Sequence, residues 1–360
     1  MSESIPGDDA GAIDLLDSPS GPTPPPPPAP AASDPAKKRR RLKIVAAILA
    51  LLLLIVGGVL AWYLLNRKPL TELPGVTQVT AVPTYKTAFY GIDKPLGVAV
   101  SPDGSRVYAT QGGTKPTTLV FDRDGKKIGE LKPPTTDTYH VPVYLAVSPT
   151  GDRVYVGDRA AGAVYVYDAS GAYVSTFTPK DASVKFSPLG VAVAKDGTLY
   201  VADVGSDNAA DHRILMFSPD GTLVKTLGKG ELNYPNQLVV DDSGDVYVTD
   251  SNNGRVAVID TAGKVSGLIS HGVGQGDLGL PRGLAIDDRG RILVVDTTDH
   301  MVRLYTKASS LTGTPAYAGS FGDQGVQDGT FLYPNGLAAD ARGRVYVADR
   351  DNNRVQVWGF

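Results

Sequence analysis

Short apolar and polar runs alternate along most of the chain, and the same order of runs returns at a nearly constant spacing. In the segment Tyr234–Asp260 the apolar run Leu-Val-Val is followed by an acidic turn that a glycine closes. Two alternating runs, Val-Tyr-Val-Thr-Asp and Gly-Arg-Val-Ala-Val-Ile, come next. A period of two is typical of strands with one buried face, and the glycine suits a turn that needs a positive φ. The pattern therefore predicts units of short antiparallel strands joined by tight turns.

Six such units follow one another, and a proline opens the apolar run of each. The prolines are 47, 46, 47, 46 and 53 residues apart. They lie at Pro95, Pro142, Pro188, Pro235, Pro281 and Pro334. A repeat of this length with about four strands is typical of radially arranged blades. We expect an all-β, six-bladed β-propeller over residues 85–360.

The two ends of the repeat region complement each other. The last unit stops after its third strand, Val355–Phe360, and Tyr85–Tyr90 has strand character with no unit before it. We expect Tyr85–Tyr90 to supply the fourth strand of the last blade, because this pairing removes an exposed sheet edge.

Residues 1–84 differ in composition from the repeats. Residues 1–43 are an acidic, proline-rich tail that ends in a basic cluster, and this composition predicts disorder. Such a tail either recruits a cytoplasmic partner or serves as a solvated spacer. Residues 44–65 carry no charge and are long enough for a single transmembrane helix. The basic cluster before them places the tail in the cytoplasm and the propeller outside it, beyond a linker at 66–84. A cleaved signal peptide is the alternative for the apolar segment.

Composition narrows the chemistry that the chain can perform. The net charge of −3 argues against nucleic-acid binding, which usually requires a basic face. The absence of cysteine excludes disulfides, cysteine-ligated metals and thiol nucleophiles. Four histidines leave little material for a histidine-rich metal centre.

Several motifs resemble the NHL-repeat family. Asp349–Val357, which reads Asp-Arg-Asp-Asn-Asn-Arg-Val-Gln-Val, is similar to the repeat signature, and so are Asp250–Val256 and His212–Leu215. Phe321–Pro334 is similar to the connector between blades. The resemblance implies a TolB-like six-bladed propeller, but NHL propellers include enzymes, sensors and protein-binding platforms. The order of tail, span and propeller resembles the sensor half of actinobacterial receptor kinases, without the kinase.

Candidate ligand-binding residues lie where the inner strands begin. In propellers this face carries the mouth of the central channel, and the residue after each repeat proline should approach it. These residues are apolar in the first three units and polar in the last three: Leu96, Val143, Leu189, Asn236, Arg282 and Asn335. We add His140, which begins an inner strand. The Arg282 guanidinium suits a carboxylate or phosphate. Alternatively, Arg282 pairs with an aspartate at a strand end, and the asparagines cap turns.

Two groups of aspartates are further candidates. Asp203, Asp207 and Asp211 surround the longest loop between a second and a third strand, and their oxygens could hold Ca²⁺; apart from this ion we expect no cofactor. Aspartate also ends the second strand in five units, and this recurrence favours a structural role. We expect these carboxylates to accept N–H groups of the following turn and to pair with arginines. The structural set comprises Asp158, Asp250, Asp296, Asp349, Arg255 and Arg354.

Together these observations favour a non-catalytic module that binds a protein, a peptide or an envelope ligand on the top face of the propeller. The alternative is an extracytoplasmic metal-dependent enzyme. Tyr333–Leu337 resembles the stretch in which lactonase and gluconolactonase propellers place a metal-binding asparagine, and amidating lyases hold a channel zinc with three histidines. Arg282 stands where the lactonases carry an acid, and the four histidines are not expected to converge, so the sequence favours binding over catalysis.

Overall fold

The structure is a computed structural model of the whole chain. It describes residues 35–65, 82–135, 139–205, 208–306, 310 and 313–360. The chain divides into two compact units, Met1–Trp62 and Tyr63–Phe360, and each is considered by itself. Residues 1–34 of the predicted tail and most of the predicted linker lie outside the described residues, whereas residues 35–43, predicted as part of the disordered tail, are helical.

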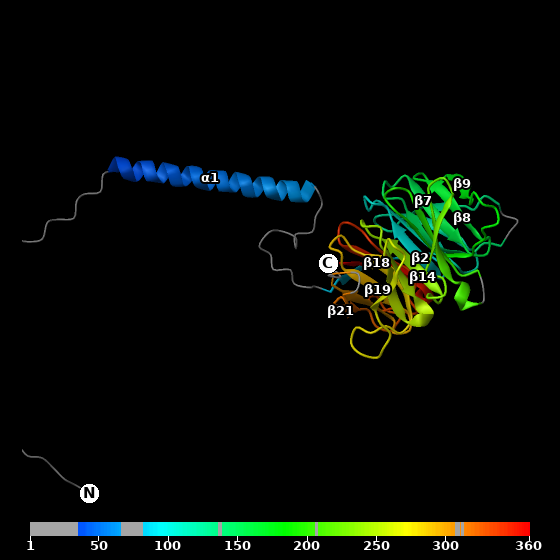
Figure 1. Cartoon of the computed structure of the whole chain (residues 1–360). Helices are drawn as coiled ribbons and strands as arrows, with labels where there is room; N and C mark the ends of the chain where they lie inside the picture. The colour runs from blue at the N-terminus through cyan, green and yellow to red at the C-terminus, as the bar shows by residue number, and fades with distance from the viewer. Residues whose placement is uncertain (1–34, 66–81, 136–138, 206–207, 307–309, 311–312) are drawn as a thin grey trace, which may run out of the picture. The chain divides into compact units, whose positions relative to one another are not determined.

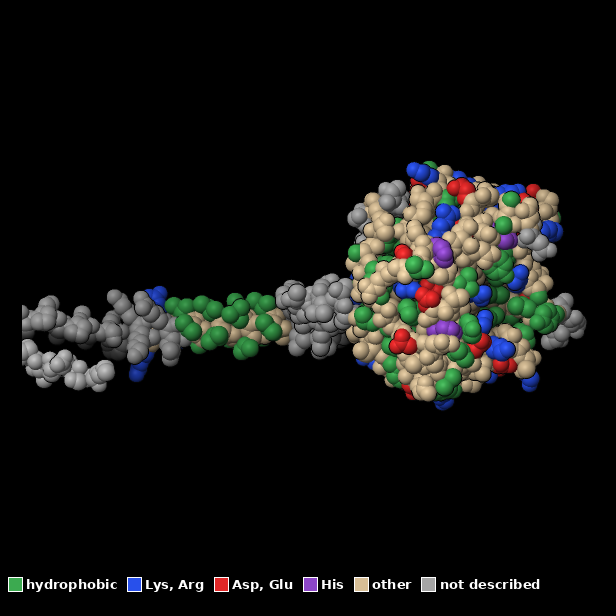
Figure 2. Space-filling model, turned by 90° about the horizontal axis from the view of Figure 1, so that it is seen from below, with side chains coloured by type: hydrophobic (Ala, Val, Ile, Leu, Met, Phe, Trp, Pro, Cys, Tyr) green, Lys and Arg blue, Asp and Glu red, His purple; other side chains and the backbone are tan. Residues whose placement is uncertain are grey.

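The described part of the first unit is a single helix, α1 (Pro35–Leu65). Its described side chains are Arg39, Arg40 and those of residues 43–58, and all of them are exposed. Figure 2 shows the hydrophobic side chains of this stretch on all visible sides of the helix. Judged on the side chains that are described, no helix is long and apolar enough to cross a membrane.

The second unit consists of six four-stranded antiparallel sheets, which confirms the predicted all-β, six-bladed propeller (Figure 1). Blades 1 to 5 each use four consecutive strands, from the inner to the outer one, and blade 6 combines both ends of the region. The strands are β1 (Thr84–Phe89), β2 (Pro95–Val100), β3 (Arg106–Gln111), β4 (Thr117–Asp122), β5 (Lys127–Leu131), β6 (Pro142–Val147), β7 (Arg153–Asp158), β8 (Ala163–Asp168), β9 (Tyr173–Phe177), β10 (Pro188–Val193), β11 (Leu199–Asp203), β12 (Arg213–Phe217), β13 (Leu223–Leu227), β14 (Pro235–Val240), β15 (Val246–Asp250), β16 (Arg255–Ile259), β17 (Val265–Ile269), β18 (Pro281–Ile286), β19 (Ile292–Asp296), β20 (Met301–Tyr305), β21 (Tyr317–Phe321), β22 (Leu337–Ala339), β23 (Arg344–Asp349) and β24 (Arg354–Gly359).

Blade 6 closes the ring as the sequence predicted. Strand β1 pairs antiparallel with β24, and the sheet order is β1-β24-β23-β22. The ring of Tyr85 on β1 packs edge-on against Trp358 on β24, with 6.0 Å between the ring centroids. The first strand of the propeller therefore completes the blade that the last strands begin.

The inner strands pack closely around the channel, and this explains the glycine at the second position after the proline in four units. A Cβ atom on Gly190 would lie 2.0 Å from the backbone oxygen of Asn236 in the next blade, and one on Gly336 would lie 2.6 Å from the backbone oxygen of Leu96. Contacts this short do not occur between real atoms, so the approach of neighbouring blades requires glycine here.

Candidate functional site

The aspartates that end the second strands tie each blade to the connector before it. All five lie at the ends of β7, β11, β15, β19 and β23, as the sequence predicted. Asp250 accepts the Asn233 N–H at 2.6 Å, and Asp296 accepts the N–H groups of Gly279 and Leu280 at 2.8 and 3.1 Å. These donors belong to the connector that precedes the inner strand, whereas we had expected the turn that follows the second strand. The following turn contributes for Asp158, which accepts from Ala161 N at 3.0 Å.

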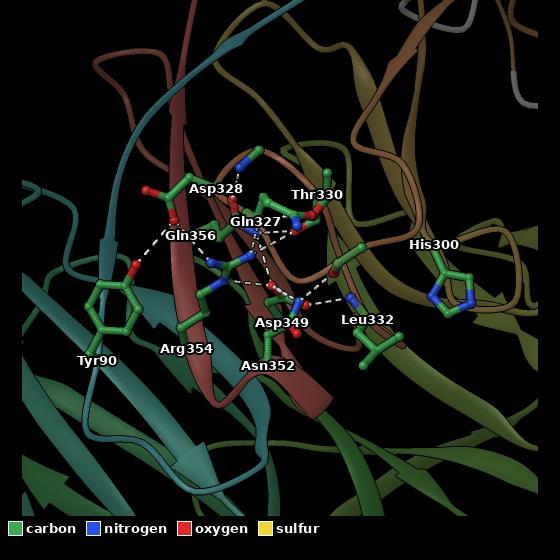
Figure 3. Close-up of polar contacts among 12 residues, drawn as sticks. Tyr90, His300, Gln327, Asp328, Thr330, Leu332, Asp349, Asn352, Arg354 and Gln356 are labelled. Carbon is green, nitrogen blue, oxygen red and sulfur yellow. Dashed lines mark hydrogen bonds and ion pairs between the residues drawn. The ribbon is translucent and has the colours of Figure 1, made fainter.

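Blade 6 shows the fullest version of this arrangement (Figure 3). The buried Asp349 carboxylate accepts hydrogen bonds from Leu332 N at 2.7 Å, Arg354 Nε at 2.8 Å, and the side-chain amides of Asn352 and Gln356 at 2.9 Å each. The Arg354 guanidinium also donates to Asp328, to Thr330 O and to Gln327 O. Because every charged atom has partners, this cluster is a structural joint with no capacity left for a ligand. The pair Arg255–Asp250 in blade 4 has the same form at 2.7 Å.

Two of the three polar residues at the mouth are buried and bound to the backbone. Asn236 donates to Tyr234 O at 3.2 Å, and Asn335 donates to Leu96 O at 2.6 Å, which links blade 6 to blade 1. Their amides thus satisfy carbonyl groups beside the channel, whereas the structural alternative expected the asparagines to cap turns.

Arg282 behaves differently from the asparagines. It is partly exposed, and the structure records one side-chain hydrogen bond for it, from Nη1 to Asn335 Oδ1 at 3.3 Å. Its Nε atom is buried and has no hydrogen-bond partner. Among the residues that the structure describes, no carboxylate forms an ion pair with Arg282, so the predicted alternative of a strand-end aspartate does not hold for it. A guanidinium has five N–H donors, and most of those on Arg282 are unused.

Two further residues at the mouth differ from the repeat pattern and were not among the predicted site residues. Tyr144 and Gln237 occupy the second position after the repeat proline, where the other four blades have glycine. Gln237 reaches across to blades 5 and 6, because its amide donates to Leu337 O at 2.6 Å and accepts the N–H groups of Leu337 and Leu284 at 3.1 and 3.3 Å. Gln237 also lines a cavity of about 230 Å³, which is otherwise formed by the later residues of all six inner strands, beyond the mouth residues. The two exceptions to glycine were the signal that could have identified these residues.

The hydroxyl of Tyr144 is buried and has no hydrogen-bond partner. Burial raises the pKa of Tyr144, and the positive charge of Arg282, the nearby Asn335 side chain and the positive charge of Arg350 oppose this increase. Both arginines therefore lie close enough to affect the hydroxyl, although Tyr144 belongs to blade 2. The Tyr144 ring packs in an apolar cluster with Val143 and Leu189, which are the mouth residues of blades 2 and 3.

Two tyrosines beside the mouth are held by histidines of the preceding blade. Tyr234 N donates to His212 Nδ1, and Tyr333 N donates to His300 Nδ1, both at 3.0 Å. Each pair of rings meets edge to face. Both tyrosines have a positive φ, 59° and 48°, which the fixed hydrogen bond helps to maintain. These two histidines thus position tyrosines.

Arginines accompany both tyrosines. Arg159 donates to the Tyr234 hydroxyl at 2.9 Å and lies over its ring at 5.7 Å from the centroid. Arg350 lies 5.6 Å from the centroid of the Tyr333 ring and pairs with Asp351 at 2.9 Å. The mouth therefore carries more positive charge than the net charge of the chain suggests.

His140 lies away from this cluster, between blades 1 and 2. Its Nδ1 atom is 2.7 Å from Asp158 Oδ2, and its Nε2 atom is 2.9 Å from Thr135 O. Both ring nitrogens already have protein partners, so the structure does not bring His140 together with Arg282.

The candidate calcium ligands are described only in part, because Asp207 lies outside the described residues. Asp203 accepts from Arg213 Nε at 2.9 Å and from Ser187 N at 2.9 Å, and Asp211 pairs with Lys229 at 3.1 Å. Within the described ranges, no group of three or more His, Asp or Glu side chains is arranged to hold a metal ion.

Comparison with known proteins identifies the repeats. Residues 232–259 and 331–358, in blades 4 and 6, match the family model described as NHL repeat. The NHL repeat-containing protein 3 of Mus musculus is 27% identical over 192 residues, which are 49% of this chain and 54% of the mouse protein. Its Homo sapiens counterpart is 28% identical over 180 residues, 45% of this chain and 51% of the human protein. The chain thus spans about half the length of these curated relatives. The matches confirm the resemblance inferred from the motifs.

Solved structures show the same fold at low sequence identity. A streptogramin B lyase superimposes with a TM-score of 0.55 at 17% identity, covering 77% of this chain and 98% of the lyase. A hydrazine synthase of Kuenenia stuttgartiensis gives a TM-score of 0.52 at 20% identity, covering 74% of this chain and 83% of that protein. At these identities the likeness concerns the fold alone.

Proposed function

We propose that this chain, whose NHL repeats belong to a six-bladed β-propeller, is a membrane-anchored, non-catalytic binding module. The propeller lies outside the cytoplasm and binds a protein, a peptide or an envelope polymer at its top face, the face at which the inner strands begin. The binding site is centred on the mouth residues of blades 4 to 6. NHL propellers generally mediate protein interactions, which supports a binding role.

Arg282 is the observation that carries the proposal. Arg213, Arg255, Arg303 and Arg354 each neutralise a strand-end aspartate at 2.7–3.3 Å. Arg282, in contrast, presents a partly exposed guanidinium without a carboxylate partner among the described residues. A rigid ring that holds an unpaired arginine at its centre is well suited to a ligand with complementary charge.

The membrane anchor is supported by the sequence of α1 and by the exposure of its described side chains. Residues 44–58 are all uncharged, and the apolar side chains among them are exposed around the helix. A helix that is apolar on all faces needs an apolar environment, which a bilayer provides. The basic cluster at the start of the helix, before the apolar segment, keeps the tail in the cytoplasm, where it binds a partner.

The metal-dependent enzyme is not favoured. The described residues lack a cluster of metal-ligating side chains, and Arg282 would repel a cation at the mouth. The lyase among the structural neighbours contributes its fold and no argument for its reaction.

Photocrosslinking from two matched positions tests the proposed function. Tyr333 beside the mouth and Tyr173 on the outer strand β9 have nearly equal exposures of 41% and 42%. The full chain carrying p-benzoylphenylalanine at position 333 should form an adduct in its native cell, and the chain with the probe at 173 should not. Arg282→Ala should remove the adduct without lowering the melting temperature. Equal adducts from both positions would refute binding at the mouth, and a lower melting temperature would make Arg282 structural.

A further inference from the structure

We propose that the mouth binds a carboxylate attached to an apolar group, with the Arg282 guanidinium as its main partner. This inference rests on the proposed function, because it specifies the ligand chemistry of the same site.

The planar guanidinium of Arg282, with its parallel N–H donors, favours a planar oxyanion. Only Nη1 has a recorded partner, at the long distance of 3.3 Å, and that partner is the neutral amide of Asn335. A carboxylate can accept two parallel N–H bonds from a guanidinium, and such charge-assisted bonds are about twice as strong as neutral ones. The carboxylate would also give the guanidinium the negative partner that the four paired arginines already have.

Neighbouring groups make the site selective for negative charge. The positive charges of Arg282 and Arg350 both oppose the rise in the pKa of Tyr144. Arg159 donates a hydrogen bond to the hydroxyl of Tyr234, which also influences that pKa. Asp351 offsets Arg350 by an ion pair at the edge of the group. The local charge is therefore positive in a chain whose net charge is −3.

The other half of the mouth offers an apolar surface to a ligand. Val143, Leu189 and Val204 form a cluster with Tyr144, and the partly exposed side chains of Leu96, Val141 and Tyr234 pack against it. A phosphate or sulfate carries polar oxygens on all sides and would leave some of them against this wall without hydrogen bonds. A carboxylate joined to an aliphatic chain matches both halves, as does the last residue of a peptide with an apolar side chain.

Two buried polar atoms at the mouth support an unfilled site. Tyr144 Oη and Arg282 Nε lack hydrogen-bond partners, and the structure records only one other such side-chain atom among the described residues, Trp358 Nε1. Buried donors without partners are rare in proteins and cost free energy, so two of them beside one channel call for a partner from outside the chain.

The test uses the purified full chain in detergent, with binding measured by calorimetry at fixed ionic strength. The probes are the peptide N-acetyl-Ala-Ala-Leu as free acid, the same peptide as its C-terminal amide, hexanoate, and inorganic phosphate. The free acid should bind at least about tenfold more tightly than the amide, because the amide loses the charge-assisted hydrogen bonds. Hexanoate that binds as well as the peptide would identify an aliphatic acid as the source, and preference for the peptide would identify a chain terminus.

Variants link the affinity to the arginine. Arg282→Gln should weaken binding of the free acid by about tenfold or more, and Arg282→Lys should have an intermediate effect because lysine keeps the charge and loses the fork. The matched control is Arg153→Gln, which removes an exposed arginine at the start of β7, on the opposite face, and should leave the affinity unchanged. Equal binding of acid and amide, tighter binding of phosphate, or an unchanged affinity in Arg282→Gln would overturn the inference. Each of these results is compatible with a specific adduct at position 333, so the proposed function can survive when the carboxylate inference fails.

Discussion

The buried pair Asp349–Arg354 permits a quantitative test of how the blades are joined. Replacing Arg354 by methionine keeps an unbranched stem in place of the arginine methylenes and removes the charge and all five N–H donors. The Asp349 carboxylate, fully buried in the native structure, then retains the Leu332 N–H and two amides but loses its ionic partner. Asp328 and the carbonyl oxygen of Thr330 lose donors as well.

The expected magnitude depends on burial, and blade 4 provides the matched control. Breaking a buried ion pair from one side costs about 3–5 kcal/mol, because a charge is left without compensation. The side chain of Arg354 is 4% exposed and that of Arg255 is 28% exposed, although both pair with a fully buried aspartate at nearly the same distance. Water can reach the position of Arg255, so Arg255→Met should cost only about 1–2 kcal/mol.

Urea unfolding of the full chain, followed by tryptophan fluorescence, measures both losses. The variant Asp349→Asn and the double variant Asp349→Asn/Arg354→Met complete a cycle. The cost of the double variant should be smaller than the sum of the single costs by about 1–3 kcal/mol. Equal costs for Arg354→Met and Arg255→Met, or additive costs in the cycle, would show that the network contributes little beyond its separate hydrogen bonds.

Two further changes test the packing around the channel and the behaviour of the protein at alkaline pH. Gly190→Ala should reduce the free energy of unfolding by about 2 kcal/mol or more, because its Cβ would lie 2.0 Å from Asn236 O. Gly129→Ala, whose nearest neighbour is 4.0 Å away, should be neutral or stabilising by about 0.4–1 kcal/mol, and equal urea midpoints would contradict the close-packing argument. Burial, followed by the charge of Asp241, raises the pKa of Tyr247 to about 12 from an unfolded value of about 10. The neutral phenol therefore contributes stability that is complete below about pH 10 and is lost as the pH rises towards 12. Tyr247→Phe should flatten this part of the curve of stability against pH, and parallel curves for variant and wild type would refute the assignment.

Features that depend on neighbouring residues could be predicted from the sequence. The strand ends at Asp158 and Asp349 and the glycine-closed turns follow from local alternation and turn chemistry. The pairing of β1 with β24 joins distant segments, but it could be inferred because a ring leaves only one open edge for an unpaired strand.

Features that depend on contacts across the channel could not be predicted in the same way. The repeat motif is defined by its glycines, so it does not indicate the two positions that lack glycine. The contacts of Tyr144 and Gln237 involve residues of blades that lie far away in sequence. The absence of an ionic partner for Arg282 is also a property of the closed ring, since aspartates are abundant in the repeats. His140 was expected at the mouth from its place in the repeat, and the repeat pattern alone did not predict its contacts with Asp158 and the Thr135 carbonyl oxygen.

The closure of blade 6 has a consequence for the order in which the protein folds. Thr84 on β1 donates through its hydroxyl to the backbone oxygen of Gly359, a residue 275 positions later in the chain. On the ribosome β1 is the first propeller strand to emerge, and its partner β24 is the last. Blades 1 to 5 can form one after another, because each uses consecutive strands. During this time β1 has no partner strand, and blade 6 keeps an open edge. Closing so long a loop costs entropy before any contact is gained, so completion of the ring should be the slow step of folding. Until that step the open edge of blade 6 can pair with the β1 strand of another copy, and the nascent propeller depends on its own first strand to prevent such exchange.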